Sequence, residues 1–393
     1  MKFALFGADE ESVALATAAV ALGHQIVWCG DIAWARRQYD FPWLSADDQG
    51  DRWESLLDDH LCDAVLVGRG EVAPALRVEQ VMALAKNGIK LLTTFPLVDS
   101  VLSFFEIDMA RQESGALVRH FNPLTEPQAI VDECAGWILA GHPQLGTVEQ
   151  VTWERPLAQR SREQVLWHFA RDVDLLNRTV GQVNRLGAHG SSDEATTYAG
   201  LSVQMLGPRN VPVRWSIGPV EHSERPRLSV IAERGKVTVL FDESERAVQM
   251  ETHPADSSAA TQLKPADPPA SAIARMVAAV EQGSRASTWS EALQAMELVD
   301  TIEISLRRGR MIDVHHPQLS EELAFKGTMS AAGCGMLLVL PPLLLVLGWL
   351  AGLVGLPVAQ YWPHVLLALL AAFLAVQVLS KLLLRKSNKD SPL

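Results

Sequence analysis

The 393-residue sequence lacks the features that mark several common classes of protein. It has four cysteines, at positions 29, 62, 134 and 334, and no C-x-x-C pair. Such scattered cysteines predict neither a zinc site nor a disulfide framework, and they suit small buried side chains in a reducing compartment. The sequence also lacks a basic excess, because its formal net charge is −12. A nucleic-acid partner is therefore excluded, since it requires a basic face that meets phosphates.

The sequence also lacks charge over one long stretch near its end. Residues 327–380 contain no Asp, Glu, Lys or Arg. A helix that spans a bilayer needs about 20 apolar residues, so this stretch predicts two such helices within residues 332–385. The turn between them carries Tyr361 and Trp362, which are typical of a membrane interface. The pattern favours a two-helix membrane hairpin over a buried hairpin in a soluble protein.

The charges that flank this hairpin predict its orientation. Lys326 precedes the first helix, and basic residues stand at the end of the second helix and in the tail 386–393, at Lys381, Arg385, Lys386 and Lys389. The positive-inside rule places both ends in the cytoplasm. The first residues do not continue as a signal peptide, because three acids at 9–11 interrupt the apolar run. We expect a bacterial-type cytoplasmic membrane protein whose partner is the lipid bilayer and whose soluble domains lie in the cytoplasm.

Residues 1–121 alternate between short apolar runs and helical segments. Strands are expected at 2–6, 25–28, 63–67, 89–93 and 116–120. Helices are expected at 12–22, 75–86 and 101–112. This alternation predicts a parallel sheet covered on both faces, so residues 1–121 are expected to form an α/β domain of the Rossmann, nucleotide-binding type.

Residues 122–314 change pattern and predict a second, α+β domain. Helices are expected at 128–140, 164–180, 271–281 and 289–308. Strands are expected at 147–155, 201–206, 211–217, 227–232 and 236–241, which predicts an open, mostly antiparallel sheet. A loop is expected at 254–269 and a linker at 315–331. Asp313, His315 and His316 stand beside this linker without a further clustered ligand, so no metal site is predicted.

Four segments carry a resemblance to a known family. They are AGHPQLGTVEQV (140–151), DVDLLNRTVG (172–181), RLSVIAERGKVTVLF (227–241) and EALQAMELVDTIEISLRRGRMIDV (291–314). With their order and spacing, residues 1–315 resemble the Gfo/Idh/MocA family of NAD(P)-dependent oxidoreductases. The resemblance implies NAD or NADP held between a Rossmann domain and an open-faced α/β domain. It also implies a sugar or another polyol as substrate, and a homo-oligomer.

The family's phosphate loop, Gly-x-Gly-x-x-Gly, aligns with GADEES at residues 7–12. Gly7 and Ala8 are candidate cofactor contacts, whereas Asp9 falls at the second glycine, where its charge repels the pyrophosphate. The alternative is an acid-capped helix without a ligand. Asp31, 24 residues past Gly7, suits a ribose hydroxyl or a helix cap. Arg69, between two glycines, suits a phosphate or a surface turn.

The family's catalytic lysine, in Glu-Lys-Pro, aligns with Phe95. Pro96 matches the family's proline, and Thr94 falls on its glutamate. Phenylalanine neither transfers a proton nor stabilises an alkoxide. Thr94 and Phe95 are therefore expected to contact a substrate or another ligand without catalysing a reaction.

The family's Asp-x-x-x-His in the second domain aligns with Trp167 and Arg171. Arginine stays protonated, so Arg171 is expected to anchor a carboxylate or phosphate of a substrate, not to act as acid or base. His168 and Asp172 stand four residues apart and could share a helix face. They are either a shifted catalytic acid/base pair or an ordinary helix-surface pair.

These departures all fall at one predicted site. The leading hypothesis is a degenerate, membrane-anchored pseudoenzyme that binds a nucleotide, a nucleotide-sugar or a partner in the interdomain cleft, without Lys-dependent hydride transfer. The first alternative is an active NAD(P)-dependent oxidoreductase on a sugar-like substrate, with rewired acid/base residues such as His168 and Asp172. The second alternative is a membrane scaffold whose cleft is empty.

Overall fold

The computed structural model describes residues 1–45, 52–57, 61–126, 129–190, 197–219, 225–254 and 259–314. The linker expected at 315–331, the membrane hairpin expected at 332–385 and the tail at 386–393 lie outside these residues. Within the described ranges, no helix is both long enough and apolar enough to cross a bilayer. Met1–His316 form one compact unit, which covers the two soluble domains expected from the sequence.

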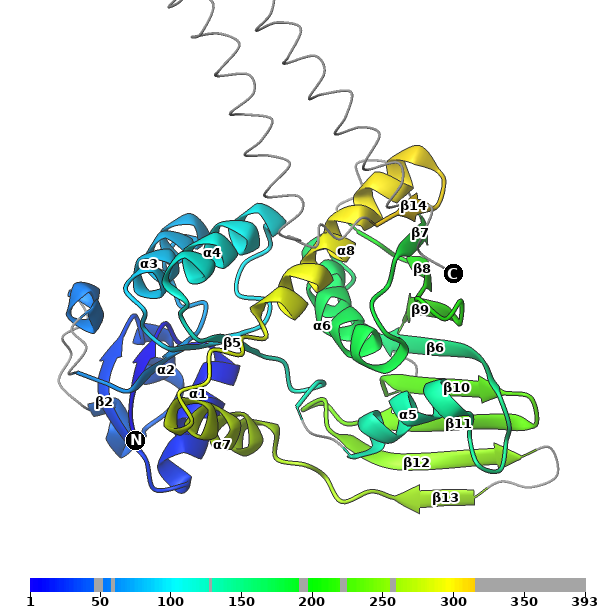
Figure 1. Cartoon of the computed structure of the whole chain (residues 1–393), viewed down its shortest axis with the longest axis horizontal. Coiled ribbons are helices and arrows are strands. Elements are labelled where there is room, and N and C mark those ends of the chain that lie inside the picture. Colours follow the sequence, from blue (N-terminus) through cyan, green and yellow to red (C-terminus); the bar gives the residue numbers. More distant parts are fainter. Residues whose placement is uncertain are drawn as a thin grey trace, which may run out of the picture. The chain divides into compact units, whose positions relative to one another are not determined.

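The first sheet is parallel, has five strands and is of the Rossmann type (Figure 1). In the spatial order β2-β1-β3-β4-β5, its strands are β2 (Gln25–Gly30), β1 (Lys2–Phe6), β3 (Ala64–Val67), β4 (Leu91–Thr94) and β5 (Val118–Phe121). Its main helices are α1 (Glu10–Ala21), α3 (Pro74–Lys86) and α4 (Val101–Ser114). The predicted α/β alternation is confirmed. All residues of β3 and β4 are buried, as expected for a parallel sheet with helices on both faces.

The loop between β1 and α1 is held by its own side chains. Gly7 has a φ of 77°, and a Cβ there would lie 2.6 Å from Arg77 Nη2, so the position requires glycine. Helix α1 begins with a capping box. Asp9 Oδ1 accepts from Ser12 N at 2.8 Å, and Ser12 Oγ accepts from Asp9 N at 2.9 Å. This loop lies at the carboxyl ends of the strands, where open α/β sheets bind ligands.

The second sheet has nine strands and is mostly antiparallel. In spatial order they are β13 (Ala259–Gln262), β12 (Ala247–Pro254), β11 (Gly235–Phe241), β10 (Arg227–Ala232), β6 (Val148–Pro156), β9 (Pro212–Gly218), β8 (Ser202–Leu206), β7 (Arg185–His189) and β14 (Ile312–Asp313). Only β6 and β9 run parallel among the described pairs of this sheet. The expected open, mostly antiparallel sheet is therefore confirmed.

Several elements were not expected from the sequence. The loop predicted at 254–269 is wrong in part, because β13 lies within it and pairs with β12. All four residues of β13 are exposed, so no buried apolar pattern marks the strand. The other unexpected elements are α2 (Ala33–Gln38), the 3-10 turns η1 (Pro42–Ser45) and η2 (Trp53–Leu57), β7 and β12.

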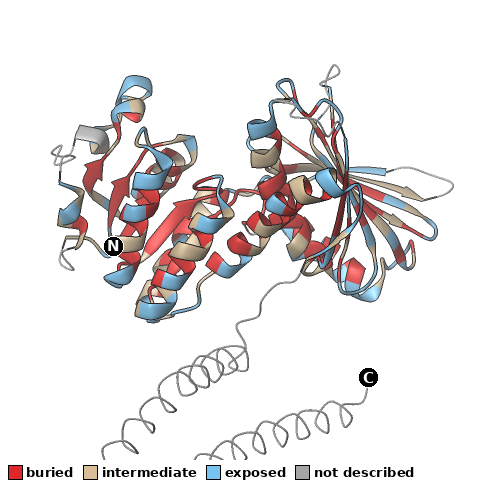
Figure 2. Ribbon diagram, turned by 90° about the horizontal axis from the view of Figure 1, so that it is seen from above, coloured by how far each residue is buried: buried red, intermediate tan, exposed pale blue. Residues whose placement is uncertain are grey.

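The remaining helices follow the first sheet along the chain. They are α5 (Ala129–Ala140), α6 (Arg162–Val180), α7 (Pro268–Glu281) and α8 (Trp289–Arg308). Helix α8 contacts α6 and β7, and also α4 and β5 of the first domain; Figure 2 shows helices between the two sheets. Helix α7 packs against α1, and its Ile273 and Met276 share a buried cluster with Phe3 and Leu5. A segment that the sequence places in the second domain thus covers the first one.

Candidate functional site

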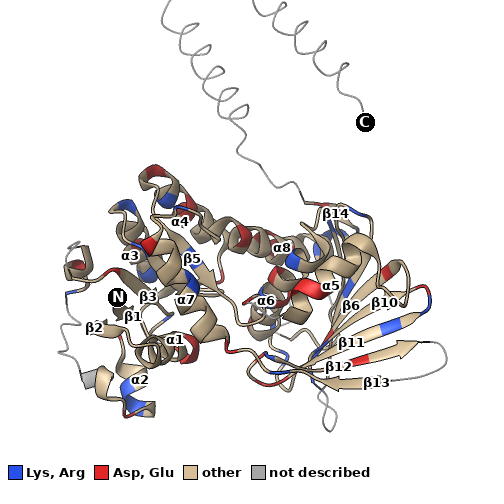
Figure 3. Ribbon diagram, turned by 60° about the horizontal axis from the view of Figure 1, so that its bottom comes forward, with Lys and Arg blue, Asp and Glu red and all other residues tan. Residues whose placement is uncertain are grey.

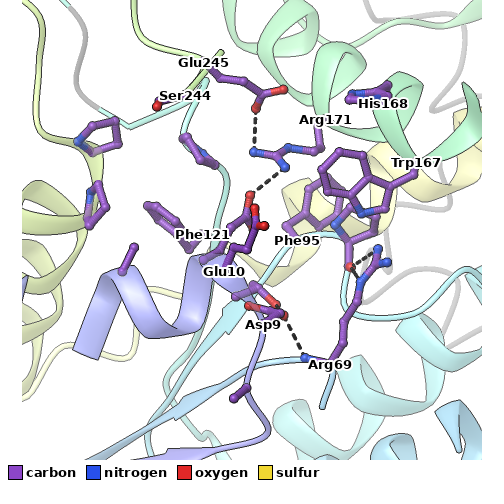
Figure 4. Close-up of a pocket in the computed structure, with 18 of the residues that line it drawn as sticks. Asp9, Glu10, Arg69, Phe95, Phe121, Trp167, His168, Arg171, Ser244 and Glu245 are labelled. Atoms are coloured by element: carbon purple, nitrogen blue, oxygen red, sulfur yellow. Dashed lines mark hydrogen bonds and ion pairs between the residues drawn. The ribbon is translucent and has the colours of Figure 1, made fainter. Parts of the chain in front are cut away.

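A cavity of about 810 Å³ lies where the two domains meet. The first domain contributes the start of α1 and the loops after β3 and β4. The second contributes α6 and the turn between β11 and β12, and the start of α7 completes the wall (Figure 4). The cavity therefore lies at the carboxyl ends of the parallel strands, where the sequence predicted a site.

Asp9 occupies the part of this cavity where a dinucleotide phosphate would be expected. Its Oδ2 accepts from Arg69 N at 2.9 Å and from Thr94 Oγ1 at 2.9 Å. Its Oδ1 accepts from Ser12 N in the capping box. Because pyrophosphate binds at this helix N-terminus in dinucleotide-binding domains, the carboxylate takes the donors that such a ligand would use.

The other predicted cofactor residues are also engaged within the protein. The amides of Gly7 and Ala8 donate to backbone carbonyls at and just beyond the end of β2, over 2.9 and 3.1 Å. Asp31, predicted to bind ribose, forms an ion pair with Arg77. Arg77 is 1% exposed and lies on α3. The residues around Arg77 in the sequence did not indicate that it pairs with Asp31, because only the fold brings α3 close to the end of β2.

Arg69 lines the cavity as predicted, but a backbone carbonyl holds its guanidinium. Its Nε and Nη2 donate to Pro96 O over 2.9 and 2.7 Å. The guanidinium lies 5.6 Å from the centroid of the Trp167 ring. Arg69 thus links the loop after β3 to the loop after β4 and faces α6.

Thr94 and Phe95 both line the cavity at the end of β4. Thr94 donates to Asp9, as described above. Phe95 is 1% exposed, and its ring packs edge-on against Phe104 and His120, with centroid distances of 6.0 and 5.1 Å. The position of the family's lysine is therefore part of the hydrophobic core.

Behind Phe95 lies a buried ion pair that sequence reasoning missed. His120 Nε2 is 3.1 Å from Asp174 Oδ2, and His120 Nδ1 is 3.0 Å from Thr288 O. Both partners are acceptors only, so both ring nitrogens carry hydrogen and His120 is an imidazolium. Burial alone lowers the pKa of His120, but the charge and hydrogen bond of Asp174 outweigh burial and raise that pKa. The two residues are 54 positions apart, so no local motif marks them.

Arg171, the predicted substrate anchor, belongs to α6 and lies between two carboxylates (Figure 4). Its Nη1 is 2.6 Å from Glu11 Oε1, and its Nη2 is 2.5 Å from Glu245 Oε2. Glu11 belongs to the first turn of α1, so this ion pair joins the two domains across the cavity. Burial, with the charges of Asp9 and Glu245, outweighs Arg171 and raises the pKa of Glu11 to about 8.

His168 and Asp172, the predicted acid/base pair, have different surroundings. Asp172 is fully buried, and its Oδ2 accepts from Arg155 Nε at 2.7 Å and from Trp215 Nε1 at 2.8 Å. His168 lines the cavity, and its Nδ1 is buried without a hydrogen-bond partner. Burial, with the charges of Arg155 and Arg171, lowers the pKa of His168 to about 2. The imidazole is therefore neutral at pH 7, and the catalytic role of the pair stays a prediction.

The side chains present do not fit the NAD or NADP that the resemblance implies. Asp9 holds the phosphate position, Asp31 is paired with an arginine, and Phe95 replaces the lysine. A bound pyrophosphate would displace a carboxylate from two of its donors and would lie beside further acids of α1. The roles predicted for Gly7, Ala8 and Arg69 stay predictions.

Comparison with known proteins supports the fold. No protein-family model and no curated protein sequence matches this chain. An aldose-aldose oxidoreductase from Caulobacter crescentus, complexed with glycerol, has a TM-score of 0.64 and 14% identity, over 80% of this chain and 99% of that one. An oxidoreductase from Agrobacterium radiobacter, in complex with NAD+, L-tartaric acid and magnesium, has a TM-score of 0.63 and 12% identity, over 80% and 98%.

A 3-ketoreductase from Actinomadura kijaniata, in complex with NADP, is similar over 78% of this chain and 97% of its own. Its TM-score is 0.61 and its identity 14%. At identities this low, the structural similarity supports the fold and does not indicate the activity. The fold expected from the resemblance is confirmed: the chain folds like the Gfo/Idh/MocA-type NAD(P)-dependent oxidoreductases.

Proposed function

We propose that this protein is a degenerate, membrane-anchored relative of these oxidoreductases. It binds a ligand in the interdomain cavity and does not carry out Lys-dependent hydride transfer. The sequence left a nucleotide, a nucleotide-sugar or a partner as the ligand. A volume of about 810 Å³ suits a small molecule, so the first two fit better than a protein partner.

The position of Asp9 is the observation that carries the proposal. Its carboxylate accepts from the Arg69 amide and the Thr94 hydroxyl at the N-terminus of α1. Glu10 and Glu11 follow in the first turn of the same helix. A dinucleotide placed there would bring its phosphates against three acids, which favours the loss of the cofactor site over its retention.

The environment of Phe95 supports the same proposal. It stands where the family has its lysine, and it is buried against Phe104 and His120. Among the described residues that line the cavity there is no lysine. His168 is neutral at pH 7 because its pKa is lowered to about 2, so it does not replace the missing ammonium.

The test is a calorimetric titration of the full chain, in detergent micelles, with NADH and NADPH. We expect a Kd weaker than about 1 mM for both cofactors, and no NADH oxidation with candidate sugars. Circular dichroism of the same sample verifies that the protein is folded. Micromolar binding together with sugar-dependent NADH consumption would contradict the proposal and would favour the active oxidoreductase.

The proposed membrane anchor is the segment 332–385, and its support is the charge-free sequence 327–380 with basic flanks. The full chain is expected in the membrane fraction of bacterial cells, resistant to salt and alkaline washes and released by detergent. A chain that ends at residue 314 is expected in the supernatant. Recovery of the full chain without detergent would contradict the anchor. The homo-oligomer proposed from the resemblance is tested by light scattering of the detergent-solubilised chain.

A further inference from the structure

The end of helix α8 carries a cluster of basic side chains at the surface (Figure 3). Arg307 and Arg308 end the helix, and Arg310 follows Gly309, which caps it. All three arginines are exposed. We call these three residues the basic turn. Because the whole chain has a net charge of −12, three exposed cations within four positions are a local exception to its acidity.

The charges of the basic turn are almost unused within the protein. In the described part of the chain, two of its three arginines have no side-chain hydrogen bond or ion pair, and Arg307 donates only to the carbonyl of Glu303, over 3.4 Å. The acids closest in sequence, Glu303 and Asp313, pair instead with Arg162 and Arg185. The helix dipole favours cations in the last turn of α8, but it does not account for the arginine beyond the cap.

Buried contacts fix the position of the basic turn. The hydroxyl of Ser305, which is fully buried, donates to Arg310 O over 2.8 Å and accepts from Ala188 N over 2.9 Å. Met311 lies against β7, because a Cβ at Gly187 would be 2.8 Å from Met311 Cγ. Met311 is nevertheless 40% exposed. A turn that is already ordered loses little entropy on binding, and the methionine adds an apolar contact beside the charges.

The basic turn lies close to the point where the chain continues towards the proposed membrane anchor. Val314 is the last described residue, and the anchor is proposed to begin at residue 332. The residues between them, 315–331, span at most about 60 Å. Such a tether holds the basic turn near the lipid headgroups at a high effective concentration. Both ends of the hairpin are expected in the cytoplasm, and the cytoplasmic leaflet carries anionic lipids.

We infer that the basic turn docks on the anionic phospholipid headgroups of the membrane that holds the anchor. A guanidinium group binds a phosphate through two parallel hydrogen bonds, and three of them complement the negative charge of the leaflet. Stable attachment to a membrane takes more than one signal, so the basic turn orients a unit that the hairpin already anchors. This inference rests on the proposed membrane anchor and adds the face of the soluble unit that meets the lipid.

Arginine footprinting of the full chain in lipid nanodiscs tests this inference. Phenylglyoxal modifies exposed guanidinium groups, and mass spectrometry measures the rate at each site. We expect the basic turn to react at least about threefold more slowly in discs with about 30% phosphatidylglycerol than in discs of phosphatidylcholine alone. The difference should disappear in about 0.5 M NaCl, because salt screens exposed charges. Arg234, exposed between β10 and β11, should react equally in both discs.

Matched variants separate this surface from positive charge in general. With Arg308→Gln and Arg310→Gln together, Arg307 should lose most of its lipid-dependent protection. The control combines Arg234→Gln and Lys236→Gln, which also remove two exposed charges. Three strands lie between β10, which precedes these control residues, and β7, which holds the basic turn. The control should therefore leave the protection of the basic turn unchanged, and thermal unfolding verifies that both variants are folded.

The possible outcomes separate this inference from the proposed anchor. Equal reaction in the two kinds of disc, with the chain incorporated in both, would overturn the inference and leave the anchor standing. Protection that is independent of the lipid would indicate an acidic protein partner or a contact within the chain, and it would also overturn the inference. A chain that does not enter the discs, as judged by size-exclusion chromatography, would overturn the anchor and the inference with it.

Discussion

The cavity has two halves. The cofactor half is formed by the start of α1 and the loops after β3 and β4, and the substrate half by α6 and the turn between β11 and β12. The two halves differ in how the hydrogen bonds of their polar groups are satisfied. In the cofactor half, Asp9 accepts hydrogen bonds from the backbone and from Thr94, and Arg69 donates to a carbonyl. In the substrate half, Arg171 Nε and His168 Nδ1 are buried without a partner. Asp9 and Arg69 are therefore satisfied within the protein, whereas two buried polar atoms of α6 lack a hydrogen bond.

This difference shows where the likeness to the oxidoreductases ends. Where the family that the sequence resembles has a phosphate-loop glycine and a lysine, this chain has Asp9 and Phe95, and these side chains bond or pack within the protein. Arg77 on α3 pairs with Asp31, although its own Nη1 stays buried without a partner. The β1–α1 loop is thus held by contacts within the protein.

The largest expected effect is a loss of stability on substitution of Asp172, which is buried on α6. Asp172→Ala removes the fully buried partner of Arg155 and Trp215, so the free energy of unfolding should fall by about 3–5 kcal/mol. Urea unfolding followed by tryptophan fluorescence measures it. Arg185→Ala, in an exposed ion pair with Asp313, should cost less than about 1 kcal/mol. If Asp172→Ala were as stable as the wild type but lacked an enzymatic activity that the wild type shows, Asp172 would instead have a catalytic role.

A lysine restored at position 95 tests whether the cofactor half can be repaired. Phe95→Lys would bury an ammonium beside the imidazolium of His120, so we expect a loss of about 3 kcal/mol or more in unfolding free energy and no NADH oxidation. Phe95→Met, which keeps the side chain apolar, should cost less than about 1.5 kcal/mol. If the lysine variant had native-like stability and oxidised NADH, the claim that Phe95 belongs to the core and closes the cofactor half would be wrong.

A glycine at position 9 should reopen the phosphate position. Asp9→Gly removes the carboxylate that holds the Arg69 amide and the Thr94 hydroxyl, so NADH affinity should rise at least about tenfold, or about 1.4 kcal/mol. Titration calorimetry compares it with Asp9→Asn, which removes the charge but keeps an acceptor oxygen. If both variants bind NADH no better than the wild type, the block lies elsewhere, and the Arg77–Asp31 pair is the next candidate.

Glu11 should make the stability depend on pH. Its folded pKa of about 8 lies above its unfolded value of 4.5, so the folded state binds a proton more tightly than the unfolded state. This contribution is fully present below pH 4.5 and is lost as pH rises through about 8. Glu11→Gln should therefore show a flatter profile between pH 5 and 8 in urea unfolding. Parallel profiles for the two proteins would refute this assignment.

The smallest expected effect concerns His168. His168→Ala removes a buried imidazole nitrogen that has no hydrogen-bond partner, which offsets part of the lost packing, so the free energy of unfolding should change by no more than about 1 kcal/mol. Urea unfolding measures this change. In the folded wild type, NMR of the imidazole should show no titration of His168 between pH 5 and 8, because its pKa is lowered to about 2. Loss of a sugar-dependent NADH oxidation in this variant would support the rewired oxidoreductase instead.

Much of the fold follows from local patterns. Short apolar runs predicted the five parallel strands, because both faces of such a sheet are buried and the strands read as continuous apolar segments. The strands β7, β12 and β13 were missed, and β13 shows why. Its residues are exposed at a sheet edge, so hydrophobic burial leaves no period in the sequence. The packing of α7 on α1 was missed because the apolar face of a helix does not indicate which element it packs against.

The sequence by itself identified Asp9 and Phe95, since both stand at positions where motifs of the family that it resembles fall. It also determined the acidity of the first turn of α1. Only the tertiary structure decided which groups these residues meet. The Glu11–Arg171 and His120–Asp174 pairs join distant parts of the chain. Ion pairs and hydrogen bonds depend on distances of a few ångströms, and those distances exist only in the folded protein.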